Sequence, residues 1–172
     1  MTQCVLITKM SGNIGKLSGV VFRVEDVKKI SEFYSEILGM SVEENNICRY
    51  PGDGAQIKLI QTRSSSKASE ANKKKSVYWK IGLSLPDVDL ARSKILQFGG
   101  IEVSTPTQFR DIGYLCHLAD PEGRSIELLQ HSFASNFVKP VENPEMALGQ
   151  DSLIGQITLR CSDISKSLQL YR

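Results

Sequence analysis

Several features that would assign a protein to a functional class at once are missing from this sequence of 172 residues. Its four cysteines include no Cys-x-x-Cys pair and show no zinc-finger spacing, so buried free thiols are the expected state. Neither a phosphate-binding glycine loop nor a Ser-His-Asp order is present. The formal net charge of +2 is too small to indicate nucleic acid or a membrane surface as a partner.

Long hydrophobic runs are also missing. The early apolar run at residues 4–7 is far too short for a signal-peptide core or a membrane span, and no Asn-x-Ser/Thr acceptor occurs. These absences predict a soluble, cytoplasmic protein. What is present is an ordinary globular composition, 41% hydrophobic and 23% charged, in a chain long enough to bury a sizeable core.

The chain contains a repeated pattern that begins with a β-rich run and a capped helix. Residues 17–24 favour a strand, and Asp26 then resembles a helix cap ahead of apolar residues at helical spacing, with Gly39 as the stop. Pro51-Gly52-Asp53-Gly54 is typical of a hairpin. Three short strands complete this β-α-β-β-β unit, at residues 40–44, 47–50 and 55–61.

The same pattern returns after a polar connector at residues 63–76. A strand at 77–85 leads to a helix capped by Asp87. The segment 159–172 aligns without gaps with residues 22–35 and starts a third copy. The second unit is completed by strands at residues 101–104, 113–119 and 125–130.

These patterns divide the chain into a leader, a domain of two units, a linker rich in turn dipeptides, and the truncated start of a second domain, at residues 1–16, 17–131, 132–153 and 154–172. A single strand with part of a helix cannot bury its apolar face. We therefore expect the chain to be the front part of a longer two-domain protein or a shortened gene product. The expected partner is that second domain or, in a homodimer, a second chain.

A tight turn followed by a strand carries the most informative carboxylate. Asp120-Pro121-Glu122-Gly123-Arg124 predicts the turn, because Pro presets φ and Gly tolerates a positive φ. Glu127 follows on the strand between apolar neighbours, so it is a candidate metal ligand or acid/base group. If the turn is type I with a glycine bulge, His117 lies opposite Glu127, with the two side chains about 5 Å apart.

The two units, the helix pattern VxDVxKxxxFYxxxLG and the closing DPEGxxIELL together resemble the vicinal oxygen chelate superfamily. This group includes glyoxalase I, bleomycin-resistance proteins and extradiol dioxygenases. The resemblance covers about residues 17–131, together with the start of another domain at 154–172. It implies an α+β fold in which paired β-α-β-β-β modules form a curled mixed sheet, with helices outside and a ligand cavity on the concave side. In the enzymes, four metal ligands point into that cavity.

The resemblance places the four ligand positions on Gly19, Lys58, Lys80 and Glu127, and only Glu127 matches. Glycine has no donor atom, and an ammonium group repels a cation. One carboxylate does not hold zinc, iron or manganese. We therefore expect no cofactor in this domain, with Glu127 a ligand only if a metal is bound, and a divalent metal at most in a full-length form. Gln156 takes the equivalent position in the third copy.

Strand alternation directs five polar residues into the implied cavity. Glu127 and His117 are the candidate catalytic residues, available for proton transfer. The alternative is a purely structural ion pair of Glu127 with Lys80 or His117, in which the charges compensate each other and take no part in catalysis. Arg23, Lys58 and Lys80 are the candidate substrate-binding residues, and their charge indicates an anionic ligand.

Three functions remain open at this stage. The first is a small-molecule, anion-binding or scaffold domain that has lost most of the superfamily's metal ligands. The alternative is a metal-dependent lyase, isomerase or dioxygenase whose site is completed by the second domain or by a dimer partner. The third is an interaction protein whose sheet edge recruits the missing half. Resemblance to an enzyme superfamily does not by itself assign a reaction.

Overall fold

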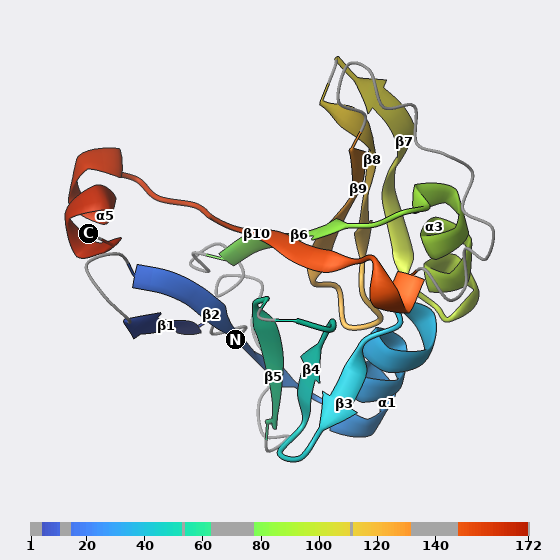
Figure 1. Cartoon of the computed structure of the whole chain (residues 1–172), viewed down its shortest axis with the longest axis horizontal. Helices are drawn as coiled ribbons and strands as arrows, with labels where there is room; N and C mark the ends of the chain where they lie inside the picture. The colour runs from blue at the N-terminus through green and yellow to red at the C-terminus, as the bar shows by residue number, and fades with distance from the viewer. Residues whose placement is uncertain are drawn as a thin grey trace.

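The computed structural model describes residues 5–10, 15–52, 54–62, 78–110, 112–131 and 148–171. Figure 1 shows two sheets, with helices α1 and α3 at the same side of the molecule. In chain order the elements are β1 (Val5–Met10), β2 (Gly15–Val24), α1 (Val27–Glu32), η1 (Phe33–Ile37), β3 (Ser41–Glu43), β4 (Ile47–Arg49), β5 (Gln56–Gln61), β6 (Tyr78–Ser84), α3 (Val88–Gln97), β7 (Ile101–Phe109), β8 (Gly113–Ala119), β9 (Ser125–His131), β10 (Leu153–Leu159) and α5 (Ile164–Tyr171). None of the helices in the described part of the chain is long and apolar enough to cross a membrane.

The first helix begins and ends at the predicted residues. The Asp26 side chain accepts a hydrogen bond from the backbone N–H of Lys29 over 3.0 Å, as an N-cap does. Gly39 ends the helix with φ +73°, a conformation that glycine adopts without strain. One feature is not predictable from the apolar spacing: the second half, η1, is a π-helical turn that follows directly on α1.

Within the described residues, ten strands form two mixed five-stranded sheets. We call them sheet A, in the order β1-β2-β5-β4-β3, and sheet B, in the order β10-β6-β9-β8-β7. Each repeat unit supplies four neighbouring strands to one sheet, with its first and last strands parallel (β2 with β5, β6 with β9). The α+β class and the two β-α-β-β-β units are thereby confirmed. The fifth strand of each sheet, β1 or β10, comes from outside the unit.

Two strands differ from the sequence-based prediction. Residues 1–16, predicted as a leader, contain β1, which pairs antiparallel with β2. A pairing partner stabilises this short segment as a strand even though its own pattern shows no period. β7 continues to Phe109 although Pro106 lies inside it. Pro106 is tolerated because β7 is an edge strand, where a missing N–H need not break a ladder on both sides.

A single hydrophobic core joins the two units. Phe22 and Tyr78 meet edge to face with ring centroids 5.4 Å apart, and Phe33 lies 5.9 Å from Phe98. These contacts connect the first strands and the helices of both units. Because the two units share this one core, they are expected to unfold together.

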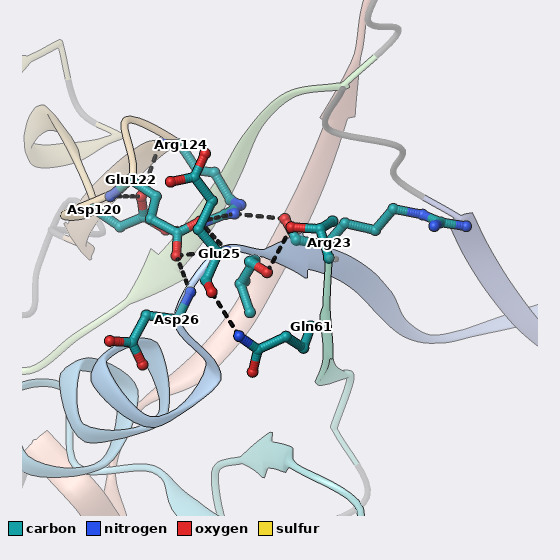
Figure 2. Close-up of polar contacts among 9 residues, drawn as sticks. Arg23, Glu25, Asp26, Gln61, Asp120, Glu122 and Arg124 are labelled. Carbon is teal, nitrogen blue, oxygen red and sulfur yellow. Dashed lines mark hydrogen bonds and ion pairs between the residues drawn. The ribbon is translucent and has the colours of Figure 1, made fainter. Parts of the chain in front are cut away.

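The predicted turn of the second unit also holds the first unit, as Figure 2 shows. The carboxylate of Glu122 accepts hydrogen bonds from the backbone N–H groups of Glu25 (2.9 Å) and Asp26 (3.0 Å), just before α1. The guanidinium of Arg124 donates to the carbonyl oxygen of Arg23 over 2.6 Å and to Glu122 over 2.6 Å. A carboxylate at a helix N-terminus is favourable, so this turn fixes where β2 leads into α1.

The third copy joins the second unit. β10 pairs antiparallel with β6 at the edge of sheet B, and Ile154 and Leu148 lie in the common core. Figure 1 shows α5 beyond the end of β10, far from α1 and α3. Most of the predicted linker, and the polar connector between the units, lie outside the described residues.

Candidate functional site

The turn before Glu127 has the predicted geometry. Gly123 adopts φ +81°, and its N–H donates to the carbonyl of Asp120 over 2.8 Å. The N–H of Asp120 in turn donates to the carbonyl of Arg124 over 2.9 Å. The register that follows sets His117 opposite Glu127, as the sequence predicts. Burial raises the pKa of the Asp120 carboxyl, although Arg124 acts in the opposite direction.

Three of the predicted site residues are in direct contact on sheet B. Lys80 donates from Nζ to Oε2 of Glu127, and Nε2 of His117 lies 2.7 Å from the same oxygen. Nζ of Lys80 and Nε2 of His117 are 3.1 Å apart. The Lys80 and Glu127 side chains are only 11% and 9% exposed, whereas that of His117 is 32% exposed. The imidazole is therefore the part of this cluster that a ligand can reach.

Ser104 is a site residue that the sequence-based analysis missed. Its hydroxyl oxygen accepts from the backbone N–H of His117 over 3.0 Å and lies 3.3 Å from Nδ1 of the same residue. In one tautomer Ser104 donates to Nδ1 and the N–H at Nε2 donates to Glu127. In the other tautomer Nε2 is free to accept from the Lys80 ammonium, and Nδ1 donates to Ser104. The only sequence signal was a polar residue on an irregular edge strand, which is too weak to single out.

Gln156, from the third copy, completes the hydrogen bonding of the Glu127 carboxylate. Its amide Nε2 donates to Oε1 of Glu127, so both carboxylate oxygens are engaged. The Gln156 side chain crosses β6 at Gly82, where any Cβ would overlap it. Gly82 pairs with Gln156 on one side and with Glu127 on the other. Because Gly82 has no side chain, the Gln156 side chain can pass over it to reach Glu127. The sequence placed Gln156 at the ligand-equivalent position of the third copy but did not indicate that its side chain would contact Glu127.

The other two predicted binding residues lie on sheet A. Arg23 on β2 is exposed, and Lys58 on β5 is half-buried opposite Val21. Figure 2 shows the Arg23 side chain extending away from the Glu122 turn. Within the described residues no hydrogen bond or ion pair joins either side chain to Lys80, His117 or Glu127. Whether they contribute to ligand binding stays a prediction.

The neighbouring Cys116 is in a poor environment for a nucleophile. It lies on β8 beside His117 but is fully buried on the opposite face, in the core. Burial raises the pKa of its thiol to about 12, so the reactive thiolate is scarce at neutral pH. Of the other described cysteines, Cys48 is buried as predicted, whereas Cys161 is exposed, and the expectation of buried thiols is wrong there.

The cluster has the parts for proton transfer at a polar ligand but a poor set for a metal ion. His117 is held by Ser104 and Glu127 at opposite ring nitrogens, which fixes its orientation. Among the described residues, no group of three or more His, Cys, Asp or Glu side chains converges as a metal site does.

Comparisons with known proteins identify the family of the fold. Residues 19–129 match the model of the glyoxalase-like domain family. A curated Vibrio cholerae protein named "Probable lactoylglutathione lyase" is 29% identical over 126 residues, which cover 66% of this chain and 89% of that protein.

Two solved structures share the fold at low identity. Maize glyoxalase I superposes with a TM-score of 0.63 at 18% identity, over 89% of this chain and 52% of the maize chain, so the chain spans about half of that protein. An antibiotic-binding protein from a Streptomyces species, TnmS3, gives a TM-score of 0.52 at 18% identity, over 71% of this chain and 100% of its own. Because the family match extends over more than half of the sequence, the chain belongs to the glyoxalase-like domain family, within the vicinal oxygen chelate superfamily.

Proposed function

We propose that this domain binds a small anionic molecule without a divalent metal, at the cluster of Lys80, His117, Glu127 and Gln156. The observation that supports this most directly is the ion pair of Lys80 and Glu127. A buried carboxylate needs a compensating charge, and the Lys80 ammonium supplies it in direct contact. A divalent cation on Glu127 would have to displace that ammonium or accept its repulsion.

The donor types at the four ligand positions of the superfamily favour the same proposal. Gly19 offers no side-chain atom, and the ammonium groups of Lys58 and Lys80 hold no lone pair while protonated. Among these four positions only Glu127 offers a donor, fewer than the three or four that zinc sites use, and the nearby His117 and Gln156 side chains are hydrogen-bonded to it. The residues present therefore fit a metal poorly, and no step is assigned to one.

The polar contacts leave hydrogen-bonding capacity for an anion at the exposed edge of the cluster. Lys80 has three N–H donors, of which Glu127 takes one, and the ammonium lies 4.8 Å from the centre of the Trp79 ring. His117 offers its exposed ring edge beside that ammonium. A ligand carboxylate or carbonyl oxygen at this edge would receive charge-assisted hydrogen bonds. Arg23 and Lys58 add positive charge on the other sheet, which attracts an anion over a longer range.

A metal-dependent lyase is the second candidate, and the similarity to the Vibrio cholerae protein named for lactoylglutathione favours it. In that case other residues must complete the site, in another domain or a partner chain. The two candidates differ in one measurable property, the requirement for metal. Lactoylglutathione is a suitable first probe because it carries carboxylates and because the Vibrio cholerae relative is named after it.

The experiment is calorimetric titration of lactoylglutathione into protein that has been treated with EDTA and dialysed. We expect binding to persist in this metal-free protein and to weaken about tenfold in Lys80→Met, equivalent to about 1.4 kcal/mol. The double variant Lys80→Met/Glu127→Gln separates loss of the ammonium from exposure of an unpaired carboxylate, and it should bind as weakly as the single variant. Lys28→Met, at a fully exposed position on α1, is the matched control.

Binding that appears only after Zn²⁺ or Ni²⁺ is added would overturn the metal-free proposal and support the lyase. Elemental analysis of the untreated protein provides a second check. About one metal ion per chain, lost in Glu127→Gln, would contradict the proposal even if lactoylglutathione were not the right ligand.

A further inference from the structure

A β-bulge in β7 turns Ser104 towards His117. Glu102 lies opposite Leu118 and Ser104 lies opposite His117, so two steps along β7 match one step along β8. Residues two apart on a regular strand share a face, whereas an extra residue turns the next side chain to the other face. Glu102 pairs with Arg92 on α3. The hydroxyl of Ser104 instead contacts the His117 side chain, on the opposite face of sheet B.

A second irregularity follows directly after Ser104. The register of β7 with β8 shifts again between Ser104 and Thr107, where Pro106 lies. Ser104 is therefore placed between two breaks in the ladder, on an edge strand. Bulges are over-represented beside active sites, where they redirect a side chain. Ser104 is half-buried, so a small molecule can reach its hydroxyl group.

Three side chains have the connectivity that nucleophilic catalysis requires. Oγ of Ser104 is 3.3 Å from Nδ1 of His117, and Nε2 of the same ring is 2.7 Å from Oε2 of Glu127. A hydroxyl nucleophile is activated by an adjacent base that a third group orients. The two ring nitrogens exchange roles relative to the serine proteases, but either nitrogen of a neutral imidazole can accept a proton while the other donates.

The tautomer of His117 decides whether Ser104 is activated. An ionised carboxylate only accepts hydrogen bonds, so its contact with Nε2 requires a proton there, which leaves Nδ1 free to accept from Ser104. The Lys80 ammonium lies 3.1 Å from Nε2 and favours the other tautomer. Glu127 is closer to Nε2, at 2.7 Å, and this shorter contact favours the activating tautomer.

We propose that Ser104 is a nucleophile that takes an acyl group from small esters or thioesters, with His117 as its base and Glu127 as the group that holds the imidazole. This reaction goes beyond anion binding and does not require it, although both use His117 and Glu127. In the first step Oγ bonds to the acyl carbon, its proton moves to Nδ1, and the alcohol or thiol leaves with that proton. In the second step water bonds to the acyl carbon, its proton passes through Nδ1 to Oγ, and the carboxylic acid is released.

The test uses the full chain and 4-nitrophenyl acetate, a neutral activated ester. We expect peptide mass spectrometry to find an acetyl group on Ser104 that hydroxylamine removes, because hydroxylamine cleaves esters and leaves lysine amides intact. This ester should be absent in Ser104→Ala and should form about a hundredfold more slowly in His117→Gln, since base catalysis contributes at least about that factor. Thr105→Ala removes an exposed hydroxyl from the same strand and is the matched control, with the wild-type rate expected.

Glu127 acts through His117, as a positioning residue, and steady-state kinetics tests this role. In Glu127→Gln the amide oxygen can still accept from the imidazole, but the charge that stabilises the imidazolium is lost. We expect kcat for ester hydrolysis to fall while KM stays unchanged. A rise in KM with kcat unaltered would contradict the proposal.

The decisive comparison is between folded proteins, which near-UV circular dichroism verifies. Wild-type protein whose acetyl groups all resist hydroxylamine overturns the proposal, and so does an equal acetylation rate in His117→Gln. Both results are obtained without Ser104→Ala, in case that variant does not fold. The lactoylglutathione titration keeps the two proposals apart. Acetylated Ser104 without anion binding would refute only the anion site, whereas anion binding with unmodified Ser104 would refute only the acyl transfer.

Discussion

Sheet A and sheet B carry opposite charges at the same position of the repeated unit. Lys58 lies opposite Val21 in sheet A, and Glu127 lies opposite the equivalent Gly82 in sheet B. The glutamate is buried and paired with Lys80, whereas Lys58 is half-buried and forms no ion pair within the described residues. Gly19 stands where sheet B has Lys80. One backbone pattern thus supports a buried polar cluster in one sheet and an open basic surface in the other.

The strand that covers each sheet sharpens this difference. β10 brings Gln156 to the register position beside Gly82, and its amide reaches Glu127. β1 brings Val5 to the equivalent position beside Val21. Sheet B therefore receives a hydrogen-bond donor from its covering strand where sheet A receives an aliphatic residue. The chemistry of each sheet is set by its neighbours as well as by its own unit.

The largest expected effect comes from removing the carboxylate of sheet B. Glu127→Ala leaves the buried Lys80 ammonium without its compensating negative charge, which should reduce the free energy of unfolding by about 3 kcal/mol or more. The matched change in sheet A, Lys58→Ala, should stay within about 0.5 kcal/mol. Urea denaturation of both variants measures the difference. Equal stabilities would show that the cluster of sheet B is as solvated as the surface of sheet A.

The glycines of the two sheets should respond differently to the same substitution. A Cβ at Gly19 would overlap the backbone carbonyl of Gln56, which cannot move without disturbing β5, so Gly19→Ala should cost about 1–3 kcal/mol. The three atoms nearest to a Cβ at Gly82 all belong to the flexible side chain of Gln156, so Gly82→Ala should cost less. It should also detach the Gln156 amide from Glu127, which the NMR shift of that side-chain NH₂ group detects. An unchanged amide shift in folded Gly82→Ala would contradict this geometry.

The smallest effect concerns the buried thiols, one in each sheet. Burial raises the pKa of Cys48 to about 11 and that of Cys116 to about 12. Since both values lie above pH 8, little thiolate is present at that pH, and iodoacetamide should leave both residues unmodified while it labels the exposed Cys161. Peptide mass spectrometry before and after urea measures this. Rapid labelling of Cys116 in the native protein would indicate that sheet B opens readily.

Local sequence signals were sufficient for the helices, the turn and one side-chain pair. Asp26 and Asp87 mark helix starts because their side chains cap N–H groups three residues ahead. The turn at residues 120–124 fixes the register of β8 against β9, so His117 opposite Glu127 could be predicted without any tertiary information. These features depend on residues that are close together in the chain. Local φ and ψ preferences and local hydrogen bonds largely dictate the geometry of such residues.

The tertiary structure alone decided which polar groups meet. The sequence determined a family fold of repeated units and a carboxylate on the last strand, but not that Gln156 would cross Gly82 to reach it, or that Ser104 would hold His117. Nor did it indicate that β1 would cover β2. Each of these contacts joins different strands of a sheet, and strand pairing depends on competition among edges that are distant in sequence. No local pattern records the outcome of that competition.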